Sequence, residues 1–236
     1  MLSLDRQNQL REQYRQSHPG WQPATELFAE LVRCNLTPYS RVLDLGCGRG
    51  GLVEQLEHPL ALVAGVDPDL VSLREHRLDL PRSQAVSHHL PFAARSFDVV
   101  FASWLVEHLA HPEKDLAEIA RVLQPGAAFV FITPNARHPL ALFNRLLGRL
   151  GALQGRLVKC LYDRAAGDAF PTYYRANSET TLARLARGAH LHLESLRAIP
   201  DPTYLAFTSI LFHAAQVLDH RLPPSRQLHL VGVLRR

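Results

Sequence analysis

The residues best suited to chemistry form a glycine-rich turn. Gly46, Gly48 and Gly51 have the spacing GxGxxG and directly follow 41–45, a short run of valine and leucines, and Asp67 comes 21 residues after Gly46. Glycines allow a tight turn and a close approach of backbone to a ligand, and a carboxylate at that distance binds ribose hydroxyls. The pattern predicts a site for a cofactor that contains ribose. On these residues alone, a dinucleotide and S-adenosylmethionine fit equally well.

The charge beside the turn favours one of the two cofactors. A dinucleotide brings a pyrophosphate, which binds at a helix N-terminus and is repelled by a nearby carboxylate. S-adenosylmethionine instead carries an ammonium and a sulfonium group. Asp44 stands two residues before the first glycine, where its side chain can reach the methionine amino group. The alternative is that Asp44 only accepts hydrogen bonds from neighbouring backbone N–H groups.

Strand and helix signals alternate through the first 135 residues. Strands are expected at 41–45, 61–66, 84–86, 97–102 and 127–133, and helices within 1–36, at 52–56, at 70–78 and from 112 to 124. Such alternation predicts an α/β fold with a parallel sheet covered on both faces. Ligands of these sheets bind at the carboxyl ends of the strands. The segments expected to face a ligand are 46–51, 67–69, 86–89, 103–108 and 134–138.

The chain after residue 135 is more basic. Residues 136–236 contain 14 Lys/Arg and 6 Asp/Glu, against 12 and 16 in residues 1–135. Residues 139–161 have apolar side chains at helical spacing with arginines between them, which predicts an amphipathic helix or helix pair. The basic surface is either a solvated face or a site for an anionic acceptor, for peripheral contact with an anionic membrane, or for a nucleic acid. Later elements are expected at 179–187, 191–198, 204–218 and 228–234.

Four motifs in a fixed order connect the sequence to a known family. They are VLDLGCGRG, GVDPD, LPFAARSFDVVFASWLVEHL and LAEIARVLQPGAAFVFITPN. From about residue 40 to 135 the chain closely resembles the class I S-adenosylmethionine-dependent methyltransferases of type 11, which include relatives of quinone-biosynthesis enzymes. The resemblance implies a Rossmann-like, doubly wound sheet of seven strands, mostly parallel, with an antiparallel last strand that Leu228–Leu234 can supply.

The same resemblance implies one methyltransferase domain over residues 1–236. Its expected parts are an N-terminal helical lid (1–36), a cofactor-binding core (37–135) and helical insertions on the acceptor side (136–176 and 200–226). The backbone of Gly46, Cys47 and Gly48 would line the methionine part. Asp67 would bind the ribose hydroxyls. The expected cofactor residues are Asp44, Gly46, Cys47, Gly48, Gly50, Asp67, Pro68 packing on the adenine, Ser87, and Ser103 beneath the cofactor.

One position departs from the family pattern. Family members usually have an acidic residue four positions ahead of the leucine in LPF, where it binds the adenine amino group. Val86 stands at that position here. The adenine would then be bound by backbone groups near Ser87 and by apolar packing, or His88 would take the place of the missing acidic residue.

Methyl transfer from a sulfonium is an in-line displacement, so positioning the acceptor supplies much of the catalysis. A base is needed only when the acceptor must lose a proton. His108 is the candidate base, since imidazole titrates in the useful range; the alternative is a structural histidine at a helix start. Some relatives use a Glu-His pair here for a divalent metal, with another Glu three residues earlier. Trp104 stands there in this chain, and no metal is expected.

The acceptor-side candidates are Tyr173, Tyr174 and Arg175, together with Asn135 and His138. Paired aromatic rings beside an arginine suit a ring or sugar with an anionic group, although the tyrosines could simply pack an insertion. We expect a small-molecule acceptor, namely a hydroxyl of a glycan, a lipid-linked intermediate or a secondary metabolite. A nucleic acid is not expected, because ASWL replaces the Asn/Asp-Pro-Pro-aromatic signature of amino-base methylation.

Two other functional classes are compatible with the glycine turn. An NAD(P)-dependent oxidoreductase shares it, but no Tyr-x-x-x-Lys set is present. A non-catalytic S-adenosylmethionine-binding module is the second. The three cysteines form no CxxC pair, and neither a signal peptide nor a long apolar run is found, so a cytoplasmic location is expected. The sequence indicates no oligomeric state.

Overall fold

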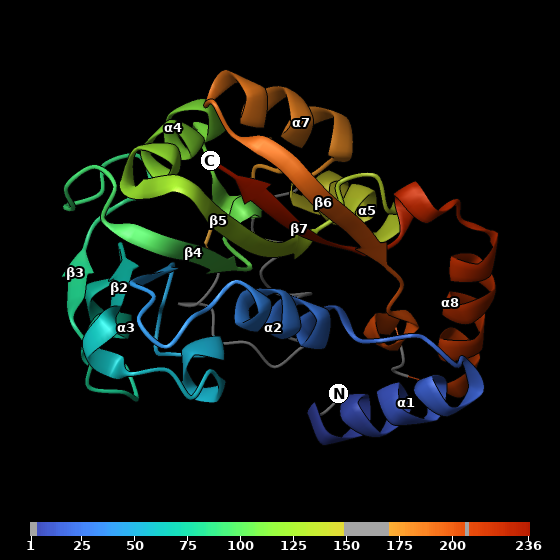
Figure 1. Ribbon diagram of the computed structural model, residues 1–236. Coiled ribbons are helices and arrows are strands. Elements are labelled where there is room, and N and C mark those ends of the chain that lie inside the picture. The colour runs from blue at the N-terminus through green and yellow to red at the C-terminus, as the bar shows by residue number, and fades with distance from the viewer. Residues whose placement is uncertain (1–3, 149–169, 206–207) are drawn as a thin grey trace. The chain divides into compact units, whose positions relative to one another are not determined.

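The computed structural model describes residues 4–148, 170–205 and 208–236 (Figure 1). These residues form two units. Unit 2 consists of Thr25–Thr133, Thr172–Arg197 and Leu230–Arg236. Unit 1 groups the described residues of Met1–Ala24, Pro134–Pro171 and Ala198–His229.

A seven-stranded sheet has the order β3-β2-β1-β4-β5-β7-β6. Its strands are β1 (Val42–Leu45), β2 (Val63–Asp67), β3 (Arg82–Gln84), β4 (Phe97–Ser103), β5 (Leu123–Pro134), β6 (His192–Ile199) and β7 (His229–Arg235). Strands β1 to β5 pair in parallel. The apolar runs of β1, β2, β4 and β5 are buried because helices cover both faces, whereas the short edge strand β3 is polar.

The last strand runs opposite to β5. Asn135 donates its backbone N–H to Leu228 at one end of the pair, and Arg236 donates to Ala127 at the other. Residue numbers therefore rise along β5 as they fall along β7, which is the antiparallel pattern (Figure 1). The predicted Rossmann-like, doubly wound, mostly parallel sheet with an antiparallel last strand is confirmed.

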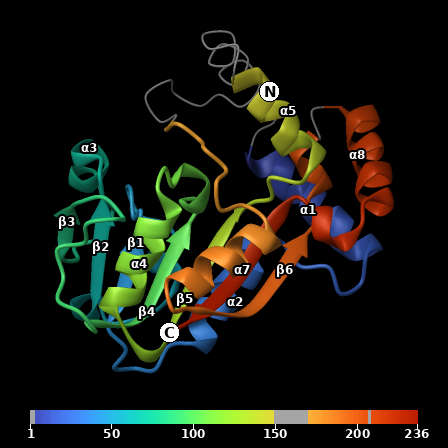
Figure 2. The ribbon, with the colours of Figure 1, turned by 90° about the horizontal axis from the view of Figure 1, so that it is seen from above.

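The helices of unit 2 cover both faces of the sheet. They are α2 (Ala24–Cys34), α3 (Leu70–Arg74), α4 (Pro112–Val122) and α7 (Glu179–Gly188), with short 3₁₀ turns η1 (Leu52–Gln55), η2 (Leu60–Leu62) and η3 (Val106–His108). Helices α4 and α7 lie together on one face, and α2 lies on the other (Figures 1 and 2). Phe28 of α2 meets Phe101 of β4 edge to face, with 6.2 Å between ring centroids.

Two predicted helices are shorter or tighter than expected. The one predicted at 70–78 is α3, which ends at Arg74. Asp69 caps its start, but Arg77 donates its N–H to the Arg49 carbonyl, which draws the chain out of helical geometry. The helix predicted at 52–56 is the single 3₁₀ turn η1, which Gly51 precedes without a side-chain cap.

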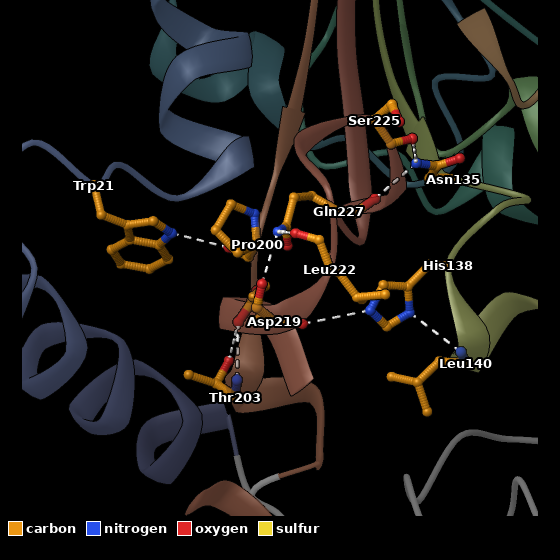
Figure 3. Close-up of polar contacts among 11 residues, drawn as sticks. Trp21, Asn135, His138, Leu140, Pro200, Thr203, Asp219, Leu222, Ser225 and Gln227 are labelled. Atoms are coloured by element: carbon orange, nitrogen blue, oxygen red, sulfur yellow. Dashed lines mark hydrogen bonds and ion pairs between the residues drawn. The ribbon is translucent and has the colours of Figure 1, made fainter. Parts of the chain in front are cut away.

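Unit 1 joins three segments that are distant in sequence. Its elements are α1 (Leu4–Ser17), α5 (Pro139–Gly148), η5 (Pro202–Leu205), α8 (Ser209–Arg221) and η6 (Pro224–Arg226). Leu10 and Tyr14 of α1 pack with Phe212 of α8. Trp21 donates its indole N–H to the Pro200 carbonyl at 2.9 Å (Figure 3). The N-terminal helix is thereby tied to the 198–229 segment.

Helix α5 occupies the first part of the helix predicted at 139–161, and the remainder of that prediction lies outside the described residues. The expected role of the N-terminal lid and the insertions stays a prediction. Within the described ranges, no helix combines the length and apolar character needed to span a lipid bilayer.

Candidate cofactor site

The glycine turn begins at the carboxyl end of β1. Gly46 and Cys47 donate their N–H groups to the Val66 carbonyl of β2, at 2.7 and 3.0 Å. A Cβ added at Gly46 would lie 3.2 Å from Cδ1 of Leu105, so that leucine closes over the turn. Positive φ angles occur at Gly46 (78°), Gly48 (50°) and Gly50 (107°). Glycine is therefore required here for backbone conformation and, at residue 46, for space as well.

Asp67 is held against this turn. One carboxylate oxygen accepts the Gly48 N–H at 2.9 Å, and the other accepts the Asp69 N–H at 2.8 Å. The side chain lies at the end of β2 and is largely buried. Two backbone donors thus fix a carboxylate at the carboxyl end of β2, next to β1, which is where a ribose is expected.

Asp44 lies inside β1, paired in register with Gly65 and Phe101, and is only 4% exposed. Among the residues that the structure describes, its carboxylate makes neither a hydrogen bond nor an ion pair. The interpretation of Asp44 as a cap for local backbone donors is therefore not supported. Burial, and to a lesser extent the negative charge of Asp67, raises the pKa of Asp44 to about 8. A buried acid beside a second acid suits a cationic ligand.

Cys47 packs its side chain onto β2. A Cβ added at Gly65 would lie 2.8 Å from the Cys47 sulfur, so the glycine of the GVD motif makes room for this cysteine. Burial, followed by the charges of Asp44 and Asp67, raises the pKa of the thiol to about 12. The thiol therefore stays protonated and fills space. Sequence reasoning missed Gly65, although its place inside an apolar strand was a signal of close packing.

The arginines nearest the turn are paired with carboxylates. Arg49 forms an ion pair with Glu75, and Arg77 forms one with Glu54. The positive charges of Arg49 and Arg77 are thus largely offset at the surface, whereas the carboxyl groups of Asp44 and Asp67 are buried beside the turn. The net electrostatics thus favour a ligand with positive charge over one with a pyrophosphate.

The remaining cofactor candidates come from the same edge of the sheet. Ala85 donates its N–H to the Asp67 carbonyl at 3.2 Å, which brings the following turn, including Ser87, beside the end of β2. Gln84 binds the Pro68 carbonyl through its side-chain amide. Ser103 ends β4 and is partly exposed. The structure thus gathers the expected residues at the carboxyl ends of β1 to β4.

A second group assembles around η3. The N–H groups of Tyr173 and Tyr174 donate to the Glu107 carbonyl at 2.8 and 3.1 Å. The Arg175 guanidinium donates to a backbone carbonyl at residue 110 and stands 5.6 Å from the centre of the Tyr173 ring. His108 is partly exposed within η3. Residues 173–175 and His108, which are far apart in sequence, therefore lie on adjoining segments.

A buried chain of hydrogen bonds supports this group, and sequence reasoning missed it. The Thr133 hydroxyl donates to the Glu107 carboxylate at 2.8 Å, and the Asn177 amide donates to the Thr133 oxygen at 2.6 Å. All three residues are nearly inaccessible to solvent. Within the described parts of the chain, no three His, Cys, Asp or Glu side chains are arranged to hold a metal ion.

Asn135 and His138 belong to unit 1 (Figure 3). The Asn135 amide donates to backbone carbonyls of residues 225 and 227. His138 is 1% exposed. Its Nδ1 accepts the Leu140 N–H, so the ring proton lies on Nε2, 3.5 Å from the Asp219 carboxylate. Both ring nitrogens are engaged within unit 1, and a contact of His138 with an acceptor stays a prediction.

Comparison with known proteins gives the family. A family model described as a methyltransferase domain matches residues 43–131. A ubiquinone biosynthesis O-methyltransferase of Thiobacillus denitrificans is 32% identical over 178 residues, covering 72% of this chain and 71% of that protein. The uncharacterized methyltransferase YodH of Bacillus subtilis is 30% identical over 131 residues, and the match covers 52% of this chain and 55% of YodH. The chain thus spans only about half the length of that relative.

A solved S-adenosylmethionine dependent methyltransferase from Mesorhizobium loti has a similar fold. Its TM-score is 0.56 at 18% identity, and the match covers 88% of this chain and 96% of that one.

The fold and the site together define a Rossmann-like cofactor-binding protein whose glycine turn lies beside two buried acids. The chain belongs to the class I S-adenosylmethionine-dependent methyltransferases, in the type 11 family. S-adenosyl-L-methionine is the cofactor of that family. Family membership therefore decides between the two cofactors that the glycine turn alone left open.

Proposed function

We propose that the chain transfers a methyl group from S-adenosylmethionine to a hydroxyl group of a small molecule. The observation that carries the proposal is the acidic pair at the end of β1 and β2. Asp44 is buried without a partner among the described residues, and backbone donors fix Asp67 beside it. Asp44 would pair with the amino group of the methionine part, and Asp67 would accept the ribose hydroxyls. The bound cofactor supplies a methyl group on a sulfonium.

The rest of the cofactor site follows from this orientation. The backbone at Gly46, Cys47 and Gly48 would line the methionine part, with Gly50 completing the turn. At the other end, Pro68 would pack against the adenine, the turn at Ser87 would border it, and Ser103 would lie beneath the cofactor. Positioning of this kind can account for much of the rate of a displacement reaction.

On the acceptor side, His108 would accept the proton of the hydroxyl as it attacks. Tyr173, Tyr174 and Arg175 would bind the acceptor, because the guanidinium beside a partly exposed ring suits an aromatic or sugar ring with an anionic group. The name of the relative, a ubiquinone biosynthesis O-methyltransferase, supports a hydroxyl acceptor. Within the classes of glycan, lipid-linked intermediate and secondary metabolite, that name favours a lipid-linked compound with a ring hydroxyl.

The test is a methyl-transfer assay with labelled S-adenosylmethionine and a panel of phenols, catechols with lipid tails, and glycans. We expect one hydroxyl class to be methylated with formation of S-adenosylhomocysteine. His108→Ala should lower kcat by about 100-fold or more, as for loss of a general base. His192→Ala, which removes an exposed histidine at the start of β6, is the matched control and should leave kcat unchanged.

Absence of S-adenosylhomocysteine binding at millimolar concentration would overturn the proposal. Binding without transfer to any hydroxyl on the panel would instead favour a non-catalytic module.

A further inference from the structure

The turn after β3 carries a serine whose hydroxyl direction is set by a residue far away in sequence. Residues 85–89 leave β3 beside Asp67, and the His89 N–H closes the turn on the Val86 carbonyl at 3.0 Å. The Ser87 hydroxyl donates to the Asp115 carboxylate of α4 at 2.6 Å. Ser87 itself remains partly accessible, whereas Asp115 is 1% exposed.

The buried Asp115 carboxylate is only partly satisfied by hydrogen bonds. One oxygen receives the Ser87 hydroxyl and lies 3.4 Å from Nδ1 of His88. The other oxygen is buried and has no hydrogen-bond partner among the described residues. A buried carboxylate oxygen without a donor is unfavourable for folding. The hydrogen bond that Asp115 does accept sets the direction of the Ser87 hydroxyl.

That effect follows from the chemistry of a hydroxyl. Serine has one proton to donate and two lone pairs that accept. Because the proton of Ser87 is directed at Asp115, only the accepting side of its oxygen faces outward. The exocyclic amino group of adenine is a donor and matches it. The carbonyl that replaces this group in hypoxanthine is an acceptor and does not.

We propose that Asp115 fixes the Ser87 hydroxyl as an acceptor for the adenine amino group, so that the pair selects adenine at the base-binding end of the site. The inference rests on the proposed function and deepens it. Val86 has no polar side chain that could read the base directly. His88 is 42% exposed in its side chain, and its Nδ1 lies beside the Asp115 carboxylate. Ser87 is the residue that contacts the base, and Asp115 is the residue that positions the Ser87 hydroxyl.

The test measures binding of S-adenosylhomocysteine and of S-inosylhomocysteine by calorimetry. The wild type should prefer the adenine compound by about tenfold. Ser87→Ala should weaken binding of the adenine compound by about three- to tenfold and leave binding of the inosine compound nearly unchanged. Asp115→Asn presents an amide that can donate to Ser87, which lets the serine proton turn outward. This variant should therefore reduce the preference by about threefold or more.

Ser96→Ala is the matched control, since Ser96 is partly exposed and its hydroxyl also donates to a neighbouring acceptor, the Ala93 carbonyl. It should keep the wild-type preference, and all variants should retain cooperative thermal unfolding. If Asp115→Asn does not fold, Ser87→Ala still decides the question.

An equal preference for adenine in the wild type, Ser87→Ala and Asp115→Asn would overturn this inference and leave the proposed function intact. Failure of the wild type to bind S-adenosylhomocysteine would overturn both.

Discussion

Cofactor affinity should depend on pH through Asp44. The pKa of this carboxyl is raised to about 8 in the unliganded protein, so at neutral pH it holds a proton. An ammonium placed against it favours the charged form and lowers its pKa, typically by about 1 to 3. Binding of S-adenosylhomocysteine must then release that proton, and affinity should rise with pH.

The size of the effect follows from linkage. If pairing lowers the pKa from about 8 to about 6, the association constant rises by about 100-fold between pH 5 and pH 9. Near pH 7 the binding of one ligand should release about 0.8 proton. Asp44→Asn removes the titrating group, so its affinity should be lower at pH 8 and nearly flat over this range. Any pH dependence that this variant still shows comes from titration of groups other than Asp44, such as those of the ligand.

Calorimetry in buffers of different ionisation enthalpy measures the released proton directly. The free energy of unfolding of the unliganded protein, measured against pH, gives a second test, because the direction of its change is set by Asp44. The pKa of Asp44 in the folded chain is above its value of 3.8 in the unfolded chain, so its contribution to stability declines as pH rises from about 4 to about 8. Asp44→Asn should therefore be more stable than wild type at pH 8 while binding more weakly. Zero proton release at pH 7, or equal pH profiles for both proteins, would refute this reasoning.

Three further predictions test the packing and the chemistry of the site. Gly65→Ala should lower the free energy of unfolding by about 1–3 kcal/mol in urea, because the added Cβ meets the Cys47 sulfur. Adding Cys47→Ala should restore much of this loss. If the double variant is no more stable than Gly65→Ala, the contact between the two residues is not the cause. Thr133→Val should cost about 1–3 kcal/mol in the same measurement by depriving the buried Glu107 of a donor, while Thr133→Ser should stay close to wild type. EDTA should leave methyl transfer unchanged, because Glu107 is engaged by Thr133; loss of activity that magnesium restores would show otherwise.

The sheet was predictable because its signals are local. Each core strand is a short apolar run, and a glycine turn or a Pro-Gly pair marks several of the boundaries. The exception is β5, which begins at Leu123 and passes through Pro125-Gly126 instead of starting after them. Leu123 already pairs with Phe97 of β4, and a register irregularity near the start of β4 accommodates the following residues. Pairing with a neighbouring strand outweighed the local turn signal there.

The supporting contacts of the site could not be predicted in the same way. Thr133 and Glu107 are 26 residues apart, and Ser87 and Asp115 are 28 apart. No periodicity links such pairs, because only the folded sheet brings their elements together. The ion pair between Arg11 and Asp201 in unit 1 joins residues 190 apart for the same reason.

Two buried acids divide the recognition of one ligand between them. The glycine turn and Asp67 suit any adenosine-containing cofactor, so neither can distinguish S-adenosylmethionine from a dinucleotide. Asp44 supplies that distinction, since an ammonium beside it favours its charged form, whereas a phosphate beside it would disfavour that form. Asp115 cannot distinguish the two cofactors, because both contain the adenine amino group. Through Ser87, Asp115 instead selects adenine over other bases. Loss of Asp44 should therefore weaken discrimination against dinucleotides, whereas loss of Asp115 should weaken discrimination against inosine analogues only, and the two effects should add because the two residues act at opposite ends of the cofactor.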